Sequence, residues 1–406
     1  MQKDSRVHPA VTIGGPGTGG SLRARPPQRP RPNAVGRVRG ALEGLDVPLT
    51  AAVIALCAAG ALSVYAATAH ASTGIRSGTY YLHRVLVNVG IGAVLAVIGY
   101  RTPVRALRGA IPALYVATCA LLLLVLTPFG ATINGAHAWF KVGPLELEPN
   151  ELAKLTVILL AAAILGDHRD RTAPQARDLL QVLGLTAIPL LLVLAEPALG
   201  VTIVIGTLVP VMFAIAGAPT RWLIGMIGGA VLLVVAAFSF HLLKPYQEQR
   251  LTSFTHPGTN ASTTGYHTSE SIIAIGDGGL SGRGFLRGEQ TNGQFVPEQQ
   301  TDFVFTVAAE EGGFLTAATI VGLVGVMLLR GIRIARRAAD LTERLVAVGI
   351  VTWLGIQAFV NIGMTMGIMP VTGLPLPLVS YGGSAMFADL FAIGLLLSIG
   401  RNADQR

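Results

Sequence analysis

Charged residues are scarce in this sequence. Asp, Glu, Lys and Arg make up only 13% of its 406 residues, whereas a soluble domain usually carries about 25%. Hydrophobic residues make up 51%, and the mean hydropathy is +0.59. This balance excludes a soluble globular protein. We attribute the net charge of +8 to membrane topology and not to nucleic-acid binding.

Cysteine is almost absent, because the chain holds only Cys57 and Cys119. Both lie in apolar runs, which favours small buried side chains over a disulfide framework.

The first 45 residues lack apolar runs. They are rich in Gly, Pro and Arg, with six arginines from Arg23 to Arg39. Such a composition cannot bury a core, so we expect residues 1–45 to form a disordered cytoplasmic tail. The tail is either solvated or rests on anionic lipid headgroups.

Long apolar runs are abundant in the rest of the chain. Ten of them approach or exceed the roughly 18–20 residues that cross a bilayer. They cover about 49–69, 84–100, 109–127, 151–166, 179–195, 199–217, 222–241, 303–329, 345–367 and 382–400. The sequence therefore predicts an all-α integral membrane protein, with ten transmembrane helices in residues 46–406. A large extracellular loop, 242–302, is predicted between the seventh and eighth helices.

The distribution of Lys and Arg predicts the orientation of these spans. With the N-terminus in the cytoplasm, the short cytoplasmic loops are basic. Their arginines are Arg101, Arg105, Arg108, Arg169, Arg171, Arg177, Arg221, Arg330, Arg333, Arg336, Arg337 and Arg344. Two outer loops, around Glu196 and over 370–381, have no Lys or Arg. We therefore expect both termini in the cytoplasm.

The most informative string is Pro297-Glu298-Gln299-Gln300-Thr301-Asp302-Phe303. It places a carboxylate where a polar stretch meets an apolar run, and charges near a bilayer are costly enough to indicate function. Asp302 can act as a general base that accepts a proton from an attacking sugar hydroxyl. Alternatively, Thr301 or Asp302 caps a helix that begins at Phe303. The two roles are compatible.

Three further acids surround this position. Glu298 precedes the apolar run, and Glu310 and Glu311 lie two helical turns inside it. Together with Asp302 they predict an acidic mouth whose oxygens can hold a divalent cation, Mg²⁺ or Mn²⁺.

Glu151 and Lys154 open the fourth span at i, i+3 spacing, so they share one helix face. They form either an interfacial ion pair or a site in which the lysine points into a polar cavity and meets a phosphate. Arg84, at the outer end of the second span, has the same two interpretations, because the arginine fork matches phosphate oxygens.

Polar residues inside the last two spans need partners. Gln357 and Asn361 lie four residues apart in the ninth span, which predicts interhelical hydrogen bonds. Asp389, inside the tenth span, must face a cavity or a partner, and the sequence does not identify which.

Residues 369–377 read Met-Pro-Val-Thr-Gly-Leu-Pro-Leu-Pro and are followed by Ser380-Tyr381-Gly382-Gly383-Ser384. The prolines and glycines predict a stiff loop with tight turns.

Together with the Asp302 string, these residues resemble the SEDS family (shape, elongation, division and sporulation). Val371-Thr372 favours its RodA-like branch over FtsW. The resemblance extends over nearly everything after residue 49.

The resemblance implies ten membrane helices with a large outer loop before the eighth. It also implies peptidoglycan glycosyltransfer, in which lipid II is polymerised at the outer face of the bacterial cytoplasmic membrane. Such proteins serve cell shape, elongation, division or sporulation, and they work with a class B penicillin-binding protein.

The family's essential aspartate maps onto Asp302, which is expected to receive the proton as undecaprenyl pyrophosphate leaves. The charge of the leaving group would be met by Arg84 and Lys154 or by a metal ion. The expected substrate contacts are Arg84, Trp139, Glu151, Lys154, Glu298, Thr301, Glu310 and Ser380.

The chain departs from the family's pattern in several places. His137 and Ala138 stand where two basic residues are usual, Ala198 replaces an acid, and Glu148 replaces a glutamine. Lost cations would weaken pyrophosphate handling unless His137 or Lys141 replaces them.

Two other functions compete with glycosyltransfer. A lipid II flippase would need charged groups on both sides of a continuous cavity, whereas the polar residues here gather at the outer face. A catalytically weak scaffold for a penicillin-binding protein would not need Asp302.

Overall fold

The computed structural model describes residues 45–70, 78–133, 136–143, 145–167, 173–240 and 264–404. The predicted tail, apart from its last residue, lies outside these residues. Residues 242–263 of the predicted outer loop also lie outside them, as does 241, the last residue of the predicted seventh span.

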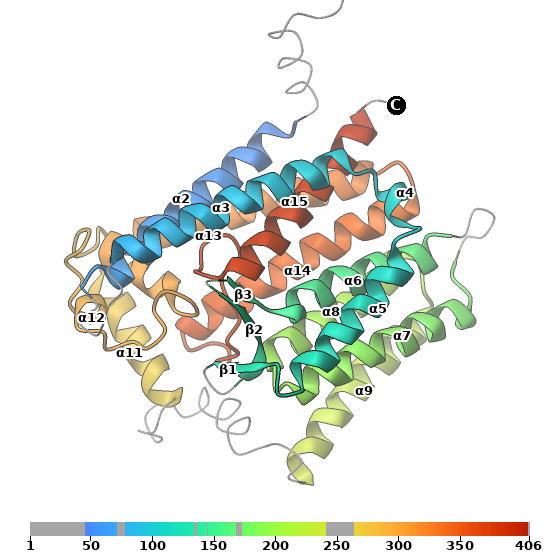
Figure 1. Cartoon of the computed structure of the whole chain (residues 1–406), viewed down its shortest axis with the longest axis horizontal. Helices are drawn as coiled ribbons and strands as arrows, with labels where there is room; N and C mark the ends of the chain where they lie inside the picture. Colours follow the sequence, from blue (N-terminus) through green and yellow to red (C-terminus); the bar gives the residue numbers. More distant parts are fainter. Residues whose placement is uncertain are drawn as a thin grey trace, which may run out of the picture. The chain divides into compact units, whose positions relative to one another are not determined.

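Helices dominate the described chain (Figure 1). Each predicted apolar range overlaps one of the longer helices, whose bounds are α2 (Val47–Ala69), α3 (Gly78–Arg101), α5 (Ile111–Val125), α6 (Pro149–Leu165), α7 (Ala176–Ala195), α8 (Leu199–Ile215), α9 (Thr220–Ser239), α13 (Val304–Arg337), α14 (Leu341–Thr365) and α15 (Gly383–Asp404). The remaining helices are α4 (Val104–Leu107), α11 (Thr264–Asp277) and α12 (Glu289–Asn292).

Within the described residues, seven helices are long and apolar enough to cross a membrane: α2, α3, α7, α9, α13, α14 and α15. The apolar helices α5 and α8 are shorter, and α6 has 17 residues. The prediction of a mostly helical integral membrane protein is confirmed.

The all-α prediction misses a small sheet. Three short strands, β1 (Ala131–Ile133), β2 (Ala136–Val142) and β3 (Leu145–Leu147), pair antiparallel in the order β1-β2-β3. Trp139 pairs with Ala131, and Phe140 pairs with Leu147. The sheet lies between α5 and α6 in the sequence, and Figure 1 shows it beside the beginning of α15.

The centre of the bundle is formed by α6 and α14. Almost every residue of α6 is buried, and Trp353 of α14 is fully buried. Gly349 allows the two helices to approach closely, because a Cβ there would stand 2.6 Å from the side chain of Ile158. Closely packed helices hold polar side chains in fixed positions, and this matters for the site described below.

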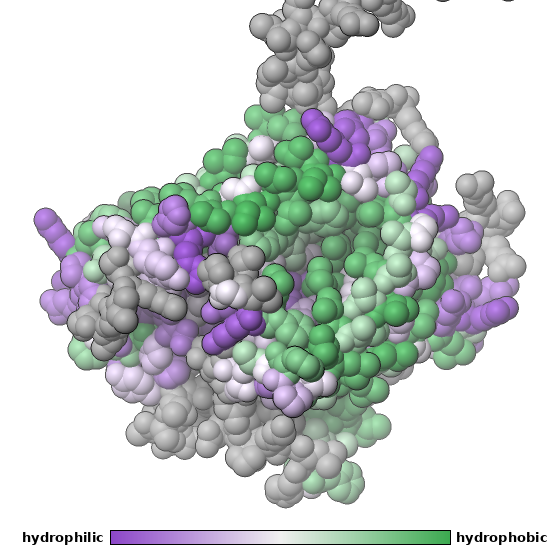
Figure 2. Space-filling view, viewed as in Figure 1, coloured by the Kyte–Doolittle hydropathy of each residue, from purple (hydrophilic) through white to green (hydrophobic). Residues whose placement is uncertain are grey.

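The outside of the bundle is apolar. None of the residues of α9 is buried, and Leu232 and Ile224 expose 69% and 66% of their surface. Figure 2 shows hydrophobic residues over the helices, with hydrophilic residues gathered at the margins of this surface. A surface of this kind faces lipid tails at no cost, whereas a soluble monomer rarely exposes large apolar patches.

Helix α13 is kinked at Gly313, whose φ of 67° lies in the left-handed region. The kink brings the helix backbone against the segment that follows α11. Phe314 N–H donates to Gly279 O at 2.9 Å, and Arg283 N–H donates to Glu310 O at 3.0 Å. A Cβ at Gly313 would stand 2.3 Å from Gly282 N, so only glycine fits this contact.

Candidate functional site

A cavity of about 310 Å³ lies where the strands, the beginning of α13 and the loop before α15 meet. Its lining residues are Tyr81, Arg84, Ala138, Trp139, Glu146, Glu148, Glu151, Pro197, Ala198, Gly200, Val201, Glu298, Gln300, Thr301, Asp302, Thr372, Gly373, Leu374, Pro375, Tyr381, Gly382, Gly383, Ser384 and Ala385. Six of the nine predicted site residues are among them.

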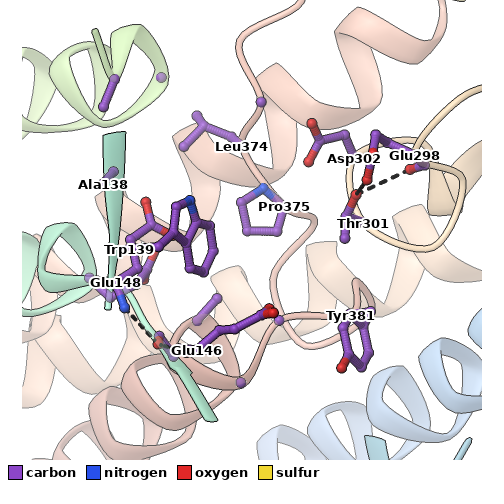
Figure 3. A pocket seen from close by; sticks show the side chains of 18 of the residues that line it. Ala138, Trp139, Glu146, Glu148, Glu298, Thr301, Asp302, Leu374, Pro375 and Tyr381 are labelled. Carbon is purple, nitrogen blue, oxygen red and sulfur yellow. Dashed lines mark hydrogen bonds between the residues drawn. The ribbon is translucent and has the colours of Figure 1, made fainter. Parts of the chain in front are cut away.

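Asp302 is held by a tight turn that begins at Glu298. Glu298 has a φ of 53°, a left-handed conformation that is costly for a non-glycine residue and concentrates at functional sites. The turn directs three successive N–H groups, of Thr301, Asp302 and Phe303, to Glu298 O at 3.1 to 3.3 Å. The Thr301 hydroxyl also donates to Glu298 Oε2 at 3.2 Å, as drawn in Figure 3.

Neither Thr301 nor Asp302 is the N-cap residue of the helix. Helix α13 begins at Val304 with Phe303 as its N-cap, and Phe303 makes no side-chain cap hydrogen bond. Thr301 and Asp302 belong to the preceding turn, where their own N–H groups donate to Glu298 O. The half-buried Asp302 side chain therefore belongs to the cavity wall.

Two side chains tie this turn to the loop before α15. Asn361 Nδ2 of α14 donates to Asp302 O at 2.8 Å and to Leu374 O at 2.7 Å. The Ser380 hydroxyl donates to Thr301 O at 2.5 Å and accepts from Leu376 N–H at 2.7 Å. Ser380 therefore fixes the loop backbone, and it does not line the cavity as predicted for a substrate contact.

The opposite wall is built by the short strands. The Ser384 hydroxyl at the start of α15 donates to Glu146 O at 2.8 Å and accepts from Glu148 N–H at 2.9 Å. Figure 3 shows Trp139 and Glu148 across the cavity from Asp302, with Pro375 between the two sides in this view.

The cavity is rich in acids. Its carboxylates are Glu146, Glu148, Glu151, Glu298 and Asp302, and Arg84 is its only basic lining residue among the described residues. Arg84 Nη1 donates to the Tyr80 hydroxyl at 3.2 Å, and its guanidinium lies 6.0 Å from the ring centre of Tyr381.

The predicted replacements for the missing cations lie elsewhere. The two ring nitrogens of His137 contact Thr132 Oγ1 at 2.8 Å and Thr127 O at 3.2 Å. These contacts engage the ring with β1 and with the turn that follows α5. Lys141 is exposed on β2 and does not line the cavity. Ala138 and Ala198, the two small residues at departures from the family pattern, do line it.

Buried acids support the floor of the site. Asn150 Nδ2 donates to Glu196 Oε2 at 2.8 Å and to Glu148 Oε1 at 3.4 Å. Burial raises the pKa of Glu196 to about 8, and the hydrogen bond from Asn150 partly opposes this shift. Burial likewise raises the pKa of Glu148, and the neighbouring Glu151 adds to the shift.

Glu151 and Lys154 form the predicted i, i+3 pair, but deep inside the bundle. Lys154 Nζ donates to Glu151 Oε1 at 2.8 Å and to Gln357 Oε1 at 2.7 Å, and it lies 4.7 Å from the ring centre of Trp353. Lys154 is fully buried and does not line the cavity. Glu151 does line it, and its second oxygen, Oε2, has no hydrogen-bond partner.

Gln357 continues this connection to the loop, because its Nε2 donates to Pro375 O at 3.0 Å. The predicted bonding of Gln357 between helices is therefore present, and it extends to the cavity wall. Asp389 is buried in α15 outside the cavity. Glu151 and Lys154 are the charged groups that act on its carboxyl.

Glu310 and Glu311 do not join Asp302 in one acidic mouth. Glu310 is fully buried, and its carboxylate accepts from Gln290 N–H at 2.8 Å, Thr291 N–H at 2.9 Å and the Thr291 hydroxyl at 2.5 Å. It therefore fastens α12 to α13 and does not line the cavity. Among the described residues, no group of three or more His, Cys, Asp or Glu side chains is placed to hold a metal ion.

Two polar lining residues, Tyr81 and Glu146, were not singled out from the sequence, and Tyr381 was named only as part of the stiff loop. The rings of Tyr81 and Tyr381 meet edge to face, with centres 5.4 Å apart. Burial raises the pKa of Tyr381 to about 12, so its hydroxyl stays protonated at neutral pH. The alternation Leu145-Glu146-Leu147-Glu148 is a strand signal from which Glu146 could have been found.

Known proteins resemble this chain over most of its length. The family described as cell cycle protein (FtsW/RodA/SpoVE) matches residues 48–405. Peptidoglycan glycosyltransferase MrdB of Escherichia coli is 38% identical over 321 residues, which are 78% of this chain and 85% of that protein. Stage V sporulation protein E of Bacillus subtilis is 35% identical over 363 residues, 88% of this chain and 97% of that protein.

Solved structures agree with these relatives. A chain from a structure titled "Structural coordination of polymerization and crosslinking by a peptidoglycan synthase complex" has a TM-score of 0.74 and 35% identity, and the match covers 89% of this chain and 99% of that one. Rod shape determining protein RodA of Thermus thermophilus has a TM-score of 0.64 and 33% identity over 89% of this chain and 98% of that one. The chain therefore belongs to the FtsW/RodA/SpoVE family, the SEDS family.

Proposed function

We propose that this protein is a peptidoglycan glycosyltransferase, which polymerises lipid II at the outer face of the bacterial cytoplasmic membrane. The names of its relatives support this activity. The observation that carries the proposal is the position of Asp302. This carboxylate lies on the wall of a cavity that also contains Arg84, at the end of a bundle with lipid-facing apolar surfaces.

In the proposed reaction, the acceptor's 4-hydroxyl attacks the anomeric carbon of the donor sugar. A new glycosidic C–O bond forms while the bond to the pyrophosphate oxygen breaks. Asp302 takes the hydroxyl proton, and undecaprenyl pyrophosphate leaves with the electron pair. The turn at Glu298 and the bond from Asn361 hold the Asp302 backbone in place. A base of fixed position is what proton transfer requires.

Arg84 is the group best placed to meet the pyrophosphate, because it is the basic lining residue of the described cavity. One guanidinium stands against four carboxylates besides Glu148, whose pKa is raised by burial. This leaves the wall acidic, which favours a divalent cation bound together with the pyrophosphate. Carboxylate oxygens suit Mg²⁺ or Mn²⁺, and Mg²⁺ at phosphates commonly takes only one or two carboxylates. Glu151, with its unpartnered buried Oε2 on the cavity wall, is the residue we assign to such an ion. The cation would neutralise charge on the leaving group.

We further propose the ten-span topology with both termini in the cytoplasm, in which α5, α6 and α8 also cross the membrane. This topology is supported by the basic segments that follow α3, α6 and α13, which contact one another at one end of the bundle. Arg105 pairs with Asp340 at 3.0 Å, and Arg108 pairs with Asp167 at 3.1 Å and donates to Thr342. The predicted loop 242–302 would then lie outside, on the side of Asp302.

The partner that we propose is a class B penicillin-binding protein, because the similar complex is named for coordinated polymerization and crosslinking.

The decisive experiment measures polymerisation of purified lipid II by the full chain, with its penicillin-binding partner where activity requires it. We expect glycan chains from the native protein and none above background from Asp302→Asn. Asp277→Asn is the matched control, because Asp277 lies on α11 outside the cavity and pairs with Arg283. Equal polymer from native protein and Asp302→Asn would remove Asp302 from the mechanism. Transport of lipid II without polymer would favour a flippase, and neither activity would favour a scaffold.

A further inference from the structure

Tyr381 lines the cavity, and its backbone is fastened to the segment that carries Asp302. Tyr381 N–H donates to Gln300 O at 2.9 Å, and the neighbouring Ser380 hydroxyl donates to Thr301 O. Figure 3 shows the Tyr381 side chain on the same side of the cavity as Asp302 in this view. The position of this tyrosine is therefore tied to that of the proposed base.

Two neighbours hold the Tyr381 ring. The ring of Tyr81 meets it edge to face, with centres 5.4 Å apart. The Arg84 guanidinium lies 6.0 Å from the centre of the Tyr381 ring and 5.6 Å from that of Tyr80, and cations at such distances are attracted to the face of an aromatic ring. Arg84 and Tyr381 both line the cavity, so the guanidinium and the phenol are adjacent donors on its wall.

The Tyr381 hydroxyl keeps its proton. Burial raises the pKa of Tyr381 to about 12, against the opposing charge of Arg84 and with a smaller contribution from Glu146. The group is therefore a hydrogen-bond donor at neutral pH. In the part of the chain that the structure describes, no hydrogen bond engages this hydroxyl, and the donor is available to an acceptor on a substrate.

We propose that the Tyr381 hydroxyl donates a hydrogen bond to the pyrophosphate of the lipid-linked donor, beside Arg84. This assignment rests on the glycosyltransferase function proposed above. The hydroxyl transfers no proton. Negative charge grows on the pyrophosphate oxygen as its bond to the anomeric carbon breaks, and a donor that is already in place stabilises that charge without reorganisation.

The pyrophosphate is favoured over a sugar hydroxyl as the acceptor. Arg84 is the only basic lining residue of the described cavity, and the other charged lining residues are carboxylates. An anionic group is therefore drawn to the part of the wall that holds Arg84 and repelled elsewhere. Tyr381 is the neutral donor next to that guanidinium.

The test compares the native protein with Tyr381→Phe. Phenylalanine removes only the hydroxyl and keeps the ring that packs against Tyr81 and Arg84, so the variant should fold. We expect kcat/KM for lipid II polymerisation to fall about 10–100-fold, as for the loss of one donor to a charged acceptor. The affinity for undecaprenyl pyrophosphate, measured by calorimetry in detergent, should fall about tenfold. Because the ring face that attracts Arg84 is retained, these losses belong to the hydroxyl.

Tyr100→Phe is the matched control. Tyr100 lies on the same helix, α3, and its ring centre also has an arginine beside it, Arg401 at 4.5 Å. It follows Arg84 by about 16 residues, which corresponds to roughly 24 Å of helix, and it does not line the cavity. The control should keep the native kcat/KM and the native affinity for undecaprenyl pyrophosphate.

Native affinity for undecaprenyl pyrophosphate in Tyr381→Phe, or native kcat/KM, would overturn the inference, and so would an equal loss in Tyr100→Phe. A loss of thermal stability with native affinity would mean that the hydroxyl serves a protein contact, such as one to Glu146. The binding measurement separates this inference from the proposed function. A native protein that makes no polymer would contradict the function, whereas weaker binding by Tyr381→Phe would still place the hydroxyl at the pyrophosphate.

Discussion

Asn361 and Asp302 are joined by a hydrogen bond of 2.8 Å, in which the buried side-chain amide of Asn361 donates to the backbone carbonyl of Asp302. The same amide nitrogen donates to Leu374 O. One side chain in the centre of α14 therefore couples the turn that carries the proposed base to the loop on the other side of the cavity.

Replacing Asn361 by Ala removes both bonds and leaves two carbonyls without their donor. We expect apparent stability to fall by about 1–3 kcal/mol, the usual cost of unsatisfied buried groups. We also expect kcat for lipid II polymerisation to fall more than tenfold, because a misplaced base costs that much. Thermal denaturation and polymer assays on one preparation separate the two effects. A variant with native kcat would show that Asp302 does not need this bond.

The buried ion pair gives a second prediction. Lys154→Met leaves Glu151 charged and unpaired in the bundle, which typically costs about 3–5 kcal/mol. The double variant Glu151→Gln/Lys154→Met should recover most of that stability, as measured by thermal denaturation of all four proteins in a double-mutant cycle.

Polymerisation by this double variant tests the role first predicted for Lys154. Because the ammonium is fully buried and bonded to Glu151 and Gln357, we expect Lys154 to position Gln357 and not to bind pyrophosphate. A folded double variant whose affinity for pyrophosphate is lost, while the single variant Glu151→Gln keeps it, would restore the phosphate role to Lys154.

The position of a site residue could be predicted from the sequence when its contacts are local. It could not be predicted when its partners lie far away along the chain. Apolar run length locates the helices, because it depends only on local composition. Asp302, Glu298 and Thr301 reach the cavity together, because one short turn carries all three. The direction of Lys154 depends on Gln357, 203 residues away, and that of Glu310 depends on α12. No local pattern contains these contacts.

The strands were missed for a related reason. Residues 131–147 contain small and polar residues, and the sheet they form is too short to show a long alternating pattern. Its register, with Trp139 opposite Ala131, turns Trp139 and Glu146 toward the cavity. The sequence motif indicated that Trp139 matters, but only the pairing shows where it lies.

Glu310 supplies a third prediction, which concerns α12. Glu310→Ala removes three hydrogen bonds to Gln290 and Thr291, each strengthened by the charge of the acceptor. We expect trypsin to cut after the exposed Arg287 about ten times faster, since local opening exposes the segment. Glu289→Gln, a change at an exposed acid of the same segment, should leave the cleavage rate unchanged. Equal rates in the two variants would contradict the fastening role.

Arg84 tests the proposed handling of the leaving group. Arg84→Gln should lower kcat/KM for lipid II by about 10–100-fold, as expected for the loss of a charged hydrogen bond. Arg84→Lys should retain part of the activity, because charge remains while the fork is lost. The control is Arg287→Gln, outside the cavity. Native kinetics in Arg84→Gln would exclude a pyrophosphate contact.

The buried Glu196 makes stability depend on pH. Its pKa is raised from 4.5 to about 8 by burial, so the folded protein holds a proton that the unfolded chain releases above about pH 4.5. Its contribution to stability is therefore full below pH 4.5 and is lost as pH rises through 8. Glu196 is fully buried, so the neutral acid is the form that the site accommodates. The hydrogen bond from Asn150 favours the charged form but does not outweigh the burial.

We expect the apparent Tm of the native protein to fall between pH 5 and pH 8, and Glu196→Gln to reduce that fall. Glutamine keeps an acceptor for Asn150 without a titrating proton, so the variant should gain about 1–3 kcal/mol over native at pH 8 and little at pH 5. Thermal denaturation at the two pH values in one detergent measures both. Glu289→Gln, which removes an exposed acid, should keep the native pH slope. A native slope in Glu196→Gln as well would assign the pH dependence to another group, such as Glu148, whose pKa is also raised by burial.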